Sequence, residues 1–296
     1  MIKNISTDKV GINSARLSLV MIRSVVFLIF SIWFSSASAQ IKIYVLCDLE
    51  GASGVYKFTQ TSEKDTPLNI QACEYFMQDL AALVRGLRDG GATEIVVLDS
   101  HGAQSFIPHM MEPGAKYITG KPRPGSAFWG LDKSFAGIVQ LAAHAMMGTT
   151  DGVLHHTQSP KPENRYWYNG VESGELVQNA YIAGYYGVPN IMVSGDVAAC
   201  REATKFFGPN CVTVAVKEGI SREAAVLYPF EETHKALYEG AKKAIAAIPK
   251  CKPYIIELPI NAKMTYLDLD PKLPEPKLMT REWTITDASQ TLTRPR

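Results

Sequence analysis

The side chains in this sequence best suited to metal chemistry follow predicted strands, at the points where the strands end. Asp48 and Glu50 come directly after the apolar segment 41–47, and His101 and His144 follow two later apolar segments. In a parallel sheet the carboxyl ends of the strands share one edge, where ligand sites form. Asp48 and Glu50 are two residues apart, so an extended segment directs both carboxylates to the same side. The pattern predicts a metal site at this edge.

Glu175 adds a third carboxylate, because it begins a predicted helix, where an acidic side chain is favoured. Three carboxylates and two imidazoles form an oxygen and nitrogen ligand set that suits Zn²⁺. Five ligands exceed the three that a single open catalytic zinc usually takes. Two metals that share a bridging carboxylate would use all five.

Each of these residues also has an ordinary structural explanation when it is taken alone. Asp48 and Glu50 could cap a turn. His101 could hold a loop, and His144 could be a hydrogen-bonded core histidine. Glu175 could be a common first-turn acid. Their joint occurrence at successive element ends favours the metal site over the separate explanations.

A pair of histidines, His155 and His156, follows in the predicted loop 152–157. With the other ligand positions filled, one of them could act as an acid, a base or an oxyanion stabiliser, because imidazole titrates near neutrality. The alternative is that both are exposed loop histidines.

The elements that must position these groups alternate along residues 40–250. The predicted strands are 41–47, 94–98, 137–143, 190–193 and 211–216, and the predicted helices are 68–88, 174–186, 198–207 and 221–248. The strands are rich in Val and Ile and too continuously apolar to be exposed on one face. The alternation predicts an α/β fold, a mostly parallel sheet with helices on both faces. Ser221 is the expected N-cap of the last helix.

The pattern changes after residue 250, where proline residues separate short strands such as 254–258 and 282–286. We therefore predict a catalytic α/β domain at 40–250 and a smaller C-terminal α+β segment, rich in strands, at 251–296.

Residues 1–39 have the layout of a secretory signal peptide: basic residues, the apolar run 25–34, and small residues before a cleavage site at Ala37-x-Ala39. The apolar run is far shorter than the roughly 20 residues that cross a bilayer. We therefore expect an exported protein, periplasmic or secreted, with no stable membrane insertion after cleavage. Met21 begins a shorter signal of the same kind, so translation could start at Met1 or at Met21.

Composition narrows the class of partner. The chain has 30 Lys+Arg and 29 Asp+Glu residues without a long basic run, which argues against binding to nucleic acid. A small-molecule partner is expected. The five cysteines show no CxxC motif, so a disulfide scaffold is not predicted. One bridge, Cys200 with Cys211, is conceivable in an exported protein.

A longer set of motifs resembles the zinc-dependent D-aminopeptidases that form self-compartmentalising rings. They run in the family's order from residue 41 to about 230, at 48–54, 99–101, 130–137, 144, 152–156, 174–176, 179–189, 194–196 and 215–222. The coverage and the order make the resemblance specific.

The resemblance implies a two-zinc aminopeptidase, with two Zn²⁺ per subunit and a water activated by both. Its zinc ligands fall on Asp48, Glu50, His101, His144 and Glu175, with Asp48 as the bridge. The family's catalytic residue falls on His156.

The resemblance also implies the substrate and the assembly. The expected substrates are short peptides or amides with an N-terminal D-amino acid such as D-Ala, and the expected assembly is a homo-oligomer, a decameric ring. Two features depart from the family: the export signal, and the segment 287–296, which ends where a further helix is expected.

Two other functions remain open at this point. Two-metal sites of carboxylates and histidines also hydrolyse phosphate esters, although no glycine-rich phosphate loop or cluster of Arg and Lys borders the ligands. A non-catalytic periplasmic binding protein of the same fold is the other alternative.

Overall fold

The computed structural model describes Met1 and residues 40–102, 104–124, 128–290 and 292. The predicted signal peptide, apart from Met1, lies outside the described residues. Gln40–Arg296 forms one compact unit. Within the described residues, no helix combines the length and the apolar character that a membrane span requires.

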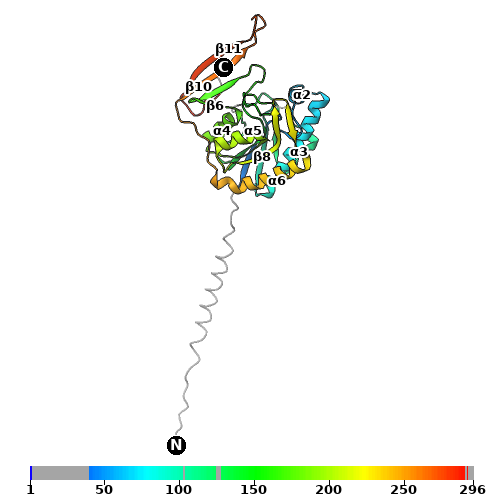
Figure 1. The fold of residues 1–296 in the computed structure, drawn as a ribbon. Coiled ribbons are helices and arrows are strands. Elements are labelled where there is room, and N and C mark those ends of the chain that lie inside the picture. The colour runs from blue at the N-terminus through cyan, green and yellow to red at the C-terminus, as the bar shows by residue number, and fades with distance from the viewer. Residues whose placement is uncertain (2–39, 103, 125–127, 291, 293–296) are drawn as a thin grey trace. The chain divides into compact units, whose positions relative to one another are not determined.

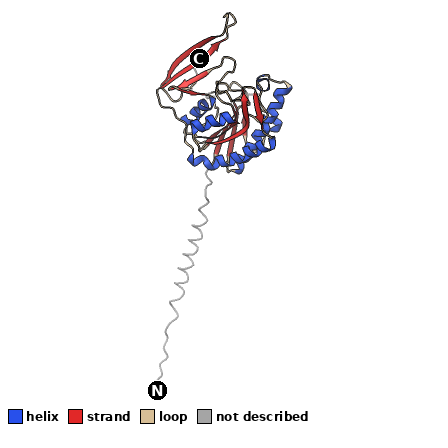
Figure 2. Ribbon diagram, viewed as in Figure 1, coloured by secondary structure: helices blue, strands red, loops and turns tan. Residues whose placement is uncertain are grey.

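In the described part of the chain, a seven-stranded sheet with the order β3-β2-β1-β4-β7-β8-β9 forms the centre of the fold (Figure 2). Its strands are β1 (Lys42–Cys47), β2 (Glu94–Asp99), β3 (Lys116–Ile118), β4 (Gly137–Ala143), β7 (Asn190–Asp196), β8 (Val212–Ser221) and β9 (Ala224–Leu227). All neighbouring pairs are parallel except β8 and β9. The central position of β1 between β2 and β4 brings the ends of these three strands together.

Helices cover both faces of this sheet (Figure 1). They are α2 (Phe58–Ser62), α3 (Pro67–Asp89), α4 (Glu175–Tyr185), α5 (Val197–Phe207) and α6 (Phe230–Ala247), with short 3₁₀ turns at Pro108–Met110 and Ile248–Lys250. The core clusters place α3 and α6 on one face and α4 and α5 on the other. The predicted α/β class is confirmed.

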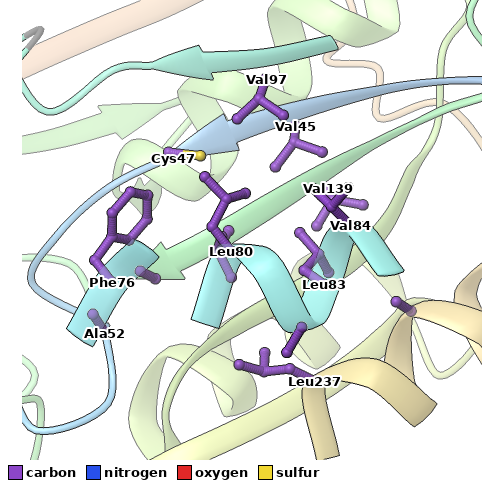
Figure 3. Packing of buried hydrophobic residues seen from close by; sticks show 14 of the residues in the cluster. Val45, Cys47, Ala52, Phe76, Leu80, Leu83, Val84, Val97, Val139 and Leu237 are labelled. Atoms are coloured by element: carbon purple, nitrogen blue, oxygen red, sulfur yellow. The ribbon is translucent and has the colours of Figure 1, made fainter. Parts of the chain in front are cut away.

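The core between α3 and the sheet shows why these segments pack as they do (Figure 3). Alternate residues of neighbouring strands, Val45, Val97 and Val139, are completely buried against the apolar side of α3, which includes Phe76 and Leu80. Each such side chain contributes about 1.5–3 kcal/mol when it is buried. The alternation of strand residues therefore fixes which side chains face the helices and which strand ends face the site.

A smaller, antiparallel sheet has the order β11-β10-β5-β6. Two of its strands precede residue 250 in the chain and two follow it. Its strands are β5 (Arg165–Tyr168), β6 (Val171–Ser173), β10 (Ile260–Asp268) and β11 (Lys277–Ile285). The predicted strand 282–286 falls at the end of β11, whereas 254–258 forms no strand. Because β10 pairs with β5, the C-terminal segment completes a sheet that begins before the predicted boundary.

The predicted helix 221–248 is wrong at its start. Ser221 ends β8, and residues 224–227 form β9, which pairs antiparallel with β8. The helix begins only at Phe230, with Pro229 as its N-cap and two glutamates in its first turn. The Ala content of 224–225 suggested a helix, but the pairing partner provided by β8 decides in favour of a hairpin, and Pro229 separates the hairpin from the helix.

The cysteines do not form the conceivable bridge. All five are free, and Cys211 instead accepts a hydrogen bond from Asn190 Nδ2 at 3.2 Å.

Candidate metal centre

An irregular end of β4 directs His144 into the site. Ala142 adopts a positive φ of 57°, and the pairing of β4 with β7 shifts between Gln140 and Ala143. Such a conformation costs a non-glycine residue on the order of 1–3 kcal/mol and persists only when neighbours enforce it. Here Gly51 donates its backbone N–H to the Ala142 carbonyl at 2.8 Å. A Cβ at Gly51 would lie 2.1 Å from the Ala143 oxygen, so only glycine permits this contact.

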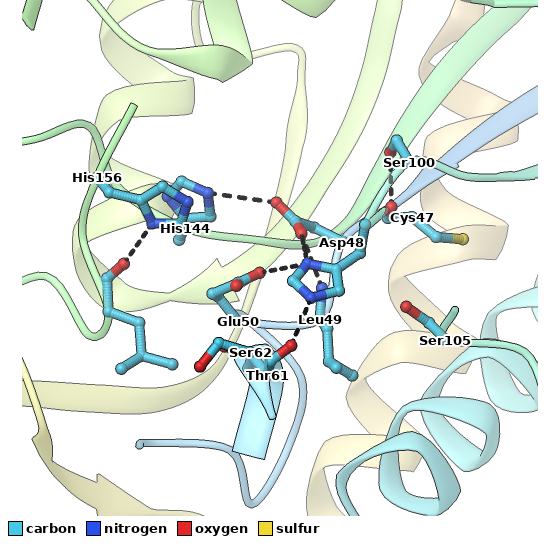
Figure 4. Close-up of polar contacts among 12 residues, drawn as sticks. Cys47, Asp48, Leu49, Glu50, Thr61, Ser62, Ser100, Ser105, His144 and His156 are labelled. Atoms are coloured by element: carbon cyan, nitrogen blue, oxygen red, sulfur yellow. Dashed lines mark hydrogen bonds and ion pairs between the residues drawn. The ribbon is translucent and has the colours of Figure 1, made fainter. Parts of the chain in front are cut away.

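Asp48 contacts two of the histidines at once (Figure 4). Its Oδ1 lies 2.9 Å from His101 Nδ1, and its Oδ2 lies 3.3 Å from His144 Nε2. The side chain projects from the end of β1, between the ends of β2 and β4, as the strand order requires. One carboxylate therefore connects His101 with His144.

Glu50 provides the clearest test of whether a cation fits. Its Oε2 lies 3.0 Å from His101 Nδ1, yet this buried oxygen has no hydrogen-bond partner. The single Nδ1 hydrogen of His101 bonds to Asp48 instead. A cation between these groups would satisfy both carboxylates, which one N–H cannot do. His101 Nε2 is held by the Thr61 carbonyl at 3.0 Å, the kind of outer contact that orients a metal ligand.

A second group forms beside the first, from His144, His156 and Glu175. The two imidazoles stack with centroids 3.9 Å apart. Each directs Nδ1 to a backbone carbonyl, that of Ala145 for His144 at 3.0 Å and that of Leu154 for His156 at 2.8 Å. Both Nε2 atoms therefore face Glu175, at 3.6 Å and 3.9 Å from its Oε1.

The spacing of these atoms suits zinc ligands. Two atoms that lie about 2.0–2.1 Å from a tetrahedral zinc are about 3.3 Å apart. The contacts of Asp48, Glu50 and Glu175 with the histidines fall between 2.9 Å and 3.6 Å, apart from the longer distance to His156. The donor atoms divide into two candidate groups, Asp48 with Glu50 and His101, and His144 with His156 and Glu175. The structure thus brings together all six predicted side chains; their roles as ligands or catalyst stay predictions.

The close contacts between carboxylates and imidazoles shift the pKa values of Asp48 and the three histidines. Burial would raise the pKa of Asp48, but hydrogen bonds from His101 and His144 hold it well below its usual range. Burial would lower the pKa values of both histidines, but the carboxylates raise that of His101 well above its ordinary value and that of His144 to about 10. Burial and the charge of His144 lower the pKa of His156. Protons on His101 and His144 thus occupy the place that a divalent cation would take.

A cavity of about 290 Å³ opens onto both groups. Its lining includes all six side chains, together with Phe58, Ser100, Gln140, Gln158 and Asn179. The volume is at the small end of ligand sites, which suits a small ligand.

The sequence pattern places Lys217 within the motif 215–222 but does not predict its role. Lys217 is completely buried, and its ammonium donates to the carbonyls of Glu50 at 2.6 Å, Ala52 at 2.9 Å and Val55. Asp79 binds the same loop by accepting from the backbone N–H of Ser53 at 2.8 Å. A lysine at the end of an apolar strand was the available signal, because lysine is almost never fully buried without partners.

We expect Lys217→Met to lower the free energy of unfolding by at least about 3 kcal/mol, because methionine keeps the buried stem but leaves three carbonyls without a donor. Urea unfolding monitored by circular dichroism measures this change. The control is Lys243→Met on an exposed helix position, which should change stability by no more than about 0.5 kcal/mol. Equal stabilities of the two variants would contradict the assigned role of Lys217.

Comparisons with known proteins find a family, a relative and a solved structure that this chain matches. The profile of the D-aminopeptidase family, peptidase M55, matches residues 41–270. A D-aminopeptidase of Bacillus subtilis (strain 168) is 32% identical over 219 residues, which cover 72% of this chain and 76% of the relative. A solved structure, the Zn-dependent D-aminopeptidase DppA from Bacillus subtilis, described as a self-compartmentalizing protease, superimposes with a TM-score of 0.74 at 25% identity. The match covers 85% of this chain and 94% of the other.

Proposed function

Because the chain belongs to the peptidase M55 family of D-aminopeptidases, we propose that it is a two-zinc exopeptidase that releases D-Ala and similar D-residues from short peptides or amides. Metal-dependent D-aminopeptidase activity follows from the family. The number of zinc ions and the preference for D-Ala are the parts that we propose. The observation that carries the number of zinc ions is the pair of adjoining donor groups joined through Asp48. The preference for D-Ala rests on the family alone.

The residues present fit two zinc ions, with Asp48 shared, Glu50 and His101 on one side and His144 and Glu175 on the other. When bound, zinc would lower the pKa of a water and polarise the scissile carbonyl. The three carboxylates hold the negative charge of the centre, and the backbone carbonyls that contact the far nitrogens of His101 and His144 keep their rings in orientation.

His156 is suited to move the proton. Its Nδ1 faces the Leu154 carbonyl and so carries the hydrogen, which leaves Nε2 as an acceptor directed at the site. Burial and the charge of His144 lower its pKa, which favours the neutral imidazole. We propose that Nε2 accepts a proton from the attacking water and returns it to the amine that leaves when the peptide bond breaks.

The similar solved structure supports an assembly. DppA is described as self-compartmentalizing, and 94% of its chain is matched here. We propose that this chain also forms a homo-oligomer, a decameric ring with its active sites facing an internal chamber.

We further propose that the mature protein acts outside the cytoplasm, on the strength of the signal-like segment 1–39. Peptides from the cell wall that contain D-Ala would then be an available substrate pool.

The test combines metal content with stereochemistry on purified residues 40–296. We expect about two zinc ions per chain, because each donor group can hold a cation. We expect release of D-Ala, but little L-Ala, from the matched alanine p-nitroanilides, because the relatives are D-aminopeptidases. A chelator should abolish the release, and added Zn²⁺ should restore it. Absence of both metal and release would contradict the proposal. Hydrolysis of p-nitrophenyl phosphate in place of the anilides would favour the phosphohydrolase.

A further inference from the structure

A chain of buried amides runs from the sheet to the cavity, and it begins at Gln140 on β4. Gln140 Nε2 donates to the backbone carbonyl of Leu176 at 3.0 Å and to Asn190 Oδ1 at 3.0 Å. A backbone carbonyl only accepts, so the atom of Gln140 that faces Leu176 must be the nitrogen. Both amide hydrogens are thereby used, and Gln140 Oε1 must point elsewhere.

That oxygen points to Asn179 on α4, which fixes the orientation of the second amide. Asn179 Nδ2 donates to Gln140 Oε1 at 3.0 Å. Its Oδ1 is therefore turned away from Gln140, and no donor in the described part of the chain contacts it. Asn179 lines the cavity of the metal centre, so this free acceptor is available to a molecule bound there.

Asn179 lies one helical turn after Glu175, so the two side chains share a face of α4. Both line the cavity, and its described lining contains no Lys or Arg. This wall therefore presents the free Asn179 oxygen beside the carboxylate of Glu175, with no Lys or Arg to pair with them. The protein cation at Glu175 is His144, whose Nε2 lies 3.6 Å from Glu175 Oε1. The complementary ligand group is a small cation with several N–H donors, which describes the α-ammonium of a peptide.

We propose that Asn179 is the residue that recognises the free amino end of the substrate, through a hydrogen bond from the α-ammonium to Oδ1 beside Glu175. This inference rests on the proposed exopeptidase function and assigns the group that restricts cleavage to the first peptide bond. An internal peptide nitrogen is uncharged and carries an acyl group, so it donates one weaker hydrogen bond and must also fit its acyl group against this wall. The buried amides of Gln140 and Asn190 hold the oxygen in place before the substrate binds.

The test replaces Asn179 with Leu in the zinc-loaded protein and follows hydrolysis of D-alanine p-nitroanilide. We expect KM to rise by about tenfold or more, because a hydrogen bond to a charged group is lost, while kcat stays within about threefold. Zinc content should match the wild type, and the melting temperature should fall by no more than about 10 °C, because the buried Gln140 Oε1 loses its donor. Asn179→Ala gives the same comparison if the leucine variant folds poorly.

Two inhibitors make the readout specific for the amine. D-alanine and D-lactate differ in the ammonium, which lactate replaces with a hydroxyl. Asn179→Leu should weaken inhibition by D-alanine about tenfold or more and inhibition by D-lactate by less than about threefold. Equal weakening of both, or of neither, would overturn the inference. Asn261→Leu, an exposed asparagine on β10 outside the cavity, is the matched control and should change neither value.

The wild-type protein separates this inference from the proposed function. If it releases no D-Ala, the exopeptidase proposal fails. If it releases D-Ala and Asn179→Leu leaves KM and the ratio of the two inhibition constants unchanged, only the role of Asn179 fails.

Discussion

Asp48→Asn is expected to reduce hydrolysis of D-alanine p-nitroanilide by at least about 10³-fold, since a metal centre supplies several kcal/mol of transition-state stabilisation and each 1.36 kcal/mol is tenfold in rate. Asparagine keeps the shape of the side chain but removes the charge. The Asp48 carboxylate lies 2.9 Å from His101 and 3.3 Å from His144, so the variant loses the charge that joins the two donor groups. We also expect the zinc content to fall in both groups rather than in one.

Elemental analysis of the dialysed variant, together with its rate, measures both effects. Asp151→Asn is the control, because Asp151 is paired with Arg201 at 2.7 Å and lies outside the lining of the cavity. It should keep the wild-type rate and zinc content. An Asp48→Asn protein with two zinc ions and an unchanged rate would remove Asp48 from the centre.

The parallel sheet could be predicted because each of its buried strands is apolar on both faces. Val45, Val97 and Val139 lie on neighbouring strands and pack against the same helix, as continuous apolar segments require. The failure at 221–230 has an equally local cause. Residues 224–225 are alanines, which fit a helix or an edge strand, and only the pairing with β8 decides between them.

The sequence could predict which side chains of the candidate site lie together, but not the contacts that hold them in place. Asp48, His101 and His144 follow three strands that turn out to be adjacent, so the rule of strand ends brought them together correctly. Nothing in the local sequence indicates that Ala142 takes a positive φ to direct His144, or that Lys217 binds a loop more than 160 residues earlier in the chain. Such contacts depend on which distant segments the fold brings together, so they leave no periodic pattern in the local sequence.

The position of His156 raises the question of whether it is a metal ligand or the residue that transfers a proton. It was predicted as the catalytic residue, yet it stacks on His144 and shares Glu175 with it. Its Nε2 lies farther from Glu175 than that of His144, at 3.9 Å against 3.6 Å, and it makes no close contact with Asp48 in the described structure. The remaining five side chains already supply donors for two metals. We therefore keep the assignment of His156 as the group that moves the proton.

His156→Ala is accordingly expected to keep about two zinc ions per chain and to lose about 10²- to 10⁴-fold in kcat, the usual contribution of a positioned acid or base. His155→Ala is the matched control. Burial, with Arg222 nearby, lowers the pKa of His155 to about 4, and its Nδ1 accepts from the Gly148 N–H at 3.2 Å, outside the cavity lining. That variant should lose less than about tenfold, since no proton of the reaction passes through it. Zinc content distinguishes loss of proton transfer from loss of a metal ion. A residue that only moves a proton can be removed without releasing a metal. A His156→Ala protein with one zinc ion would therefore show that His156 is a ligand.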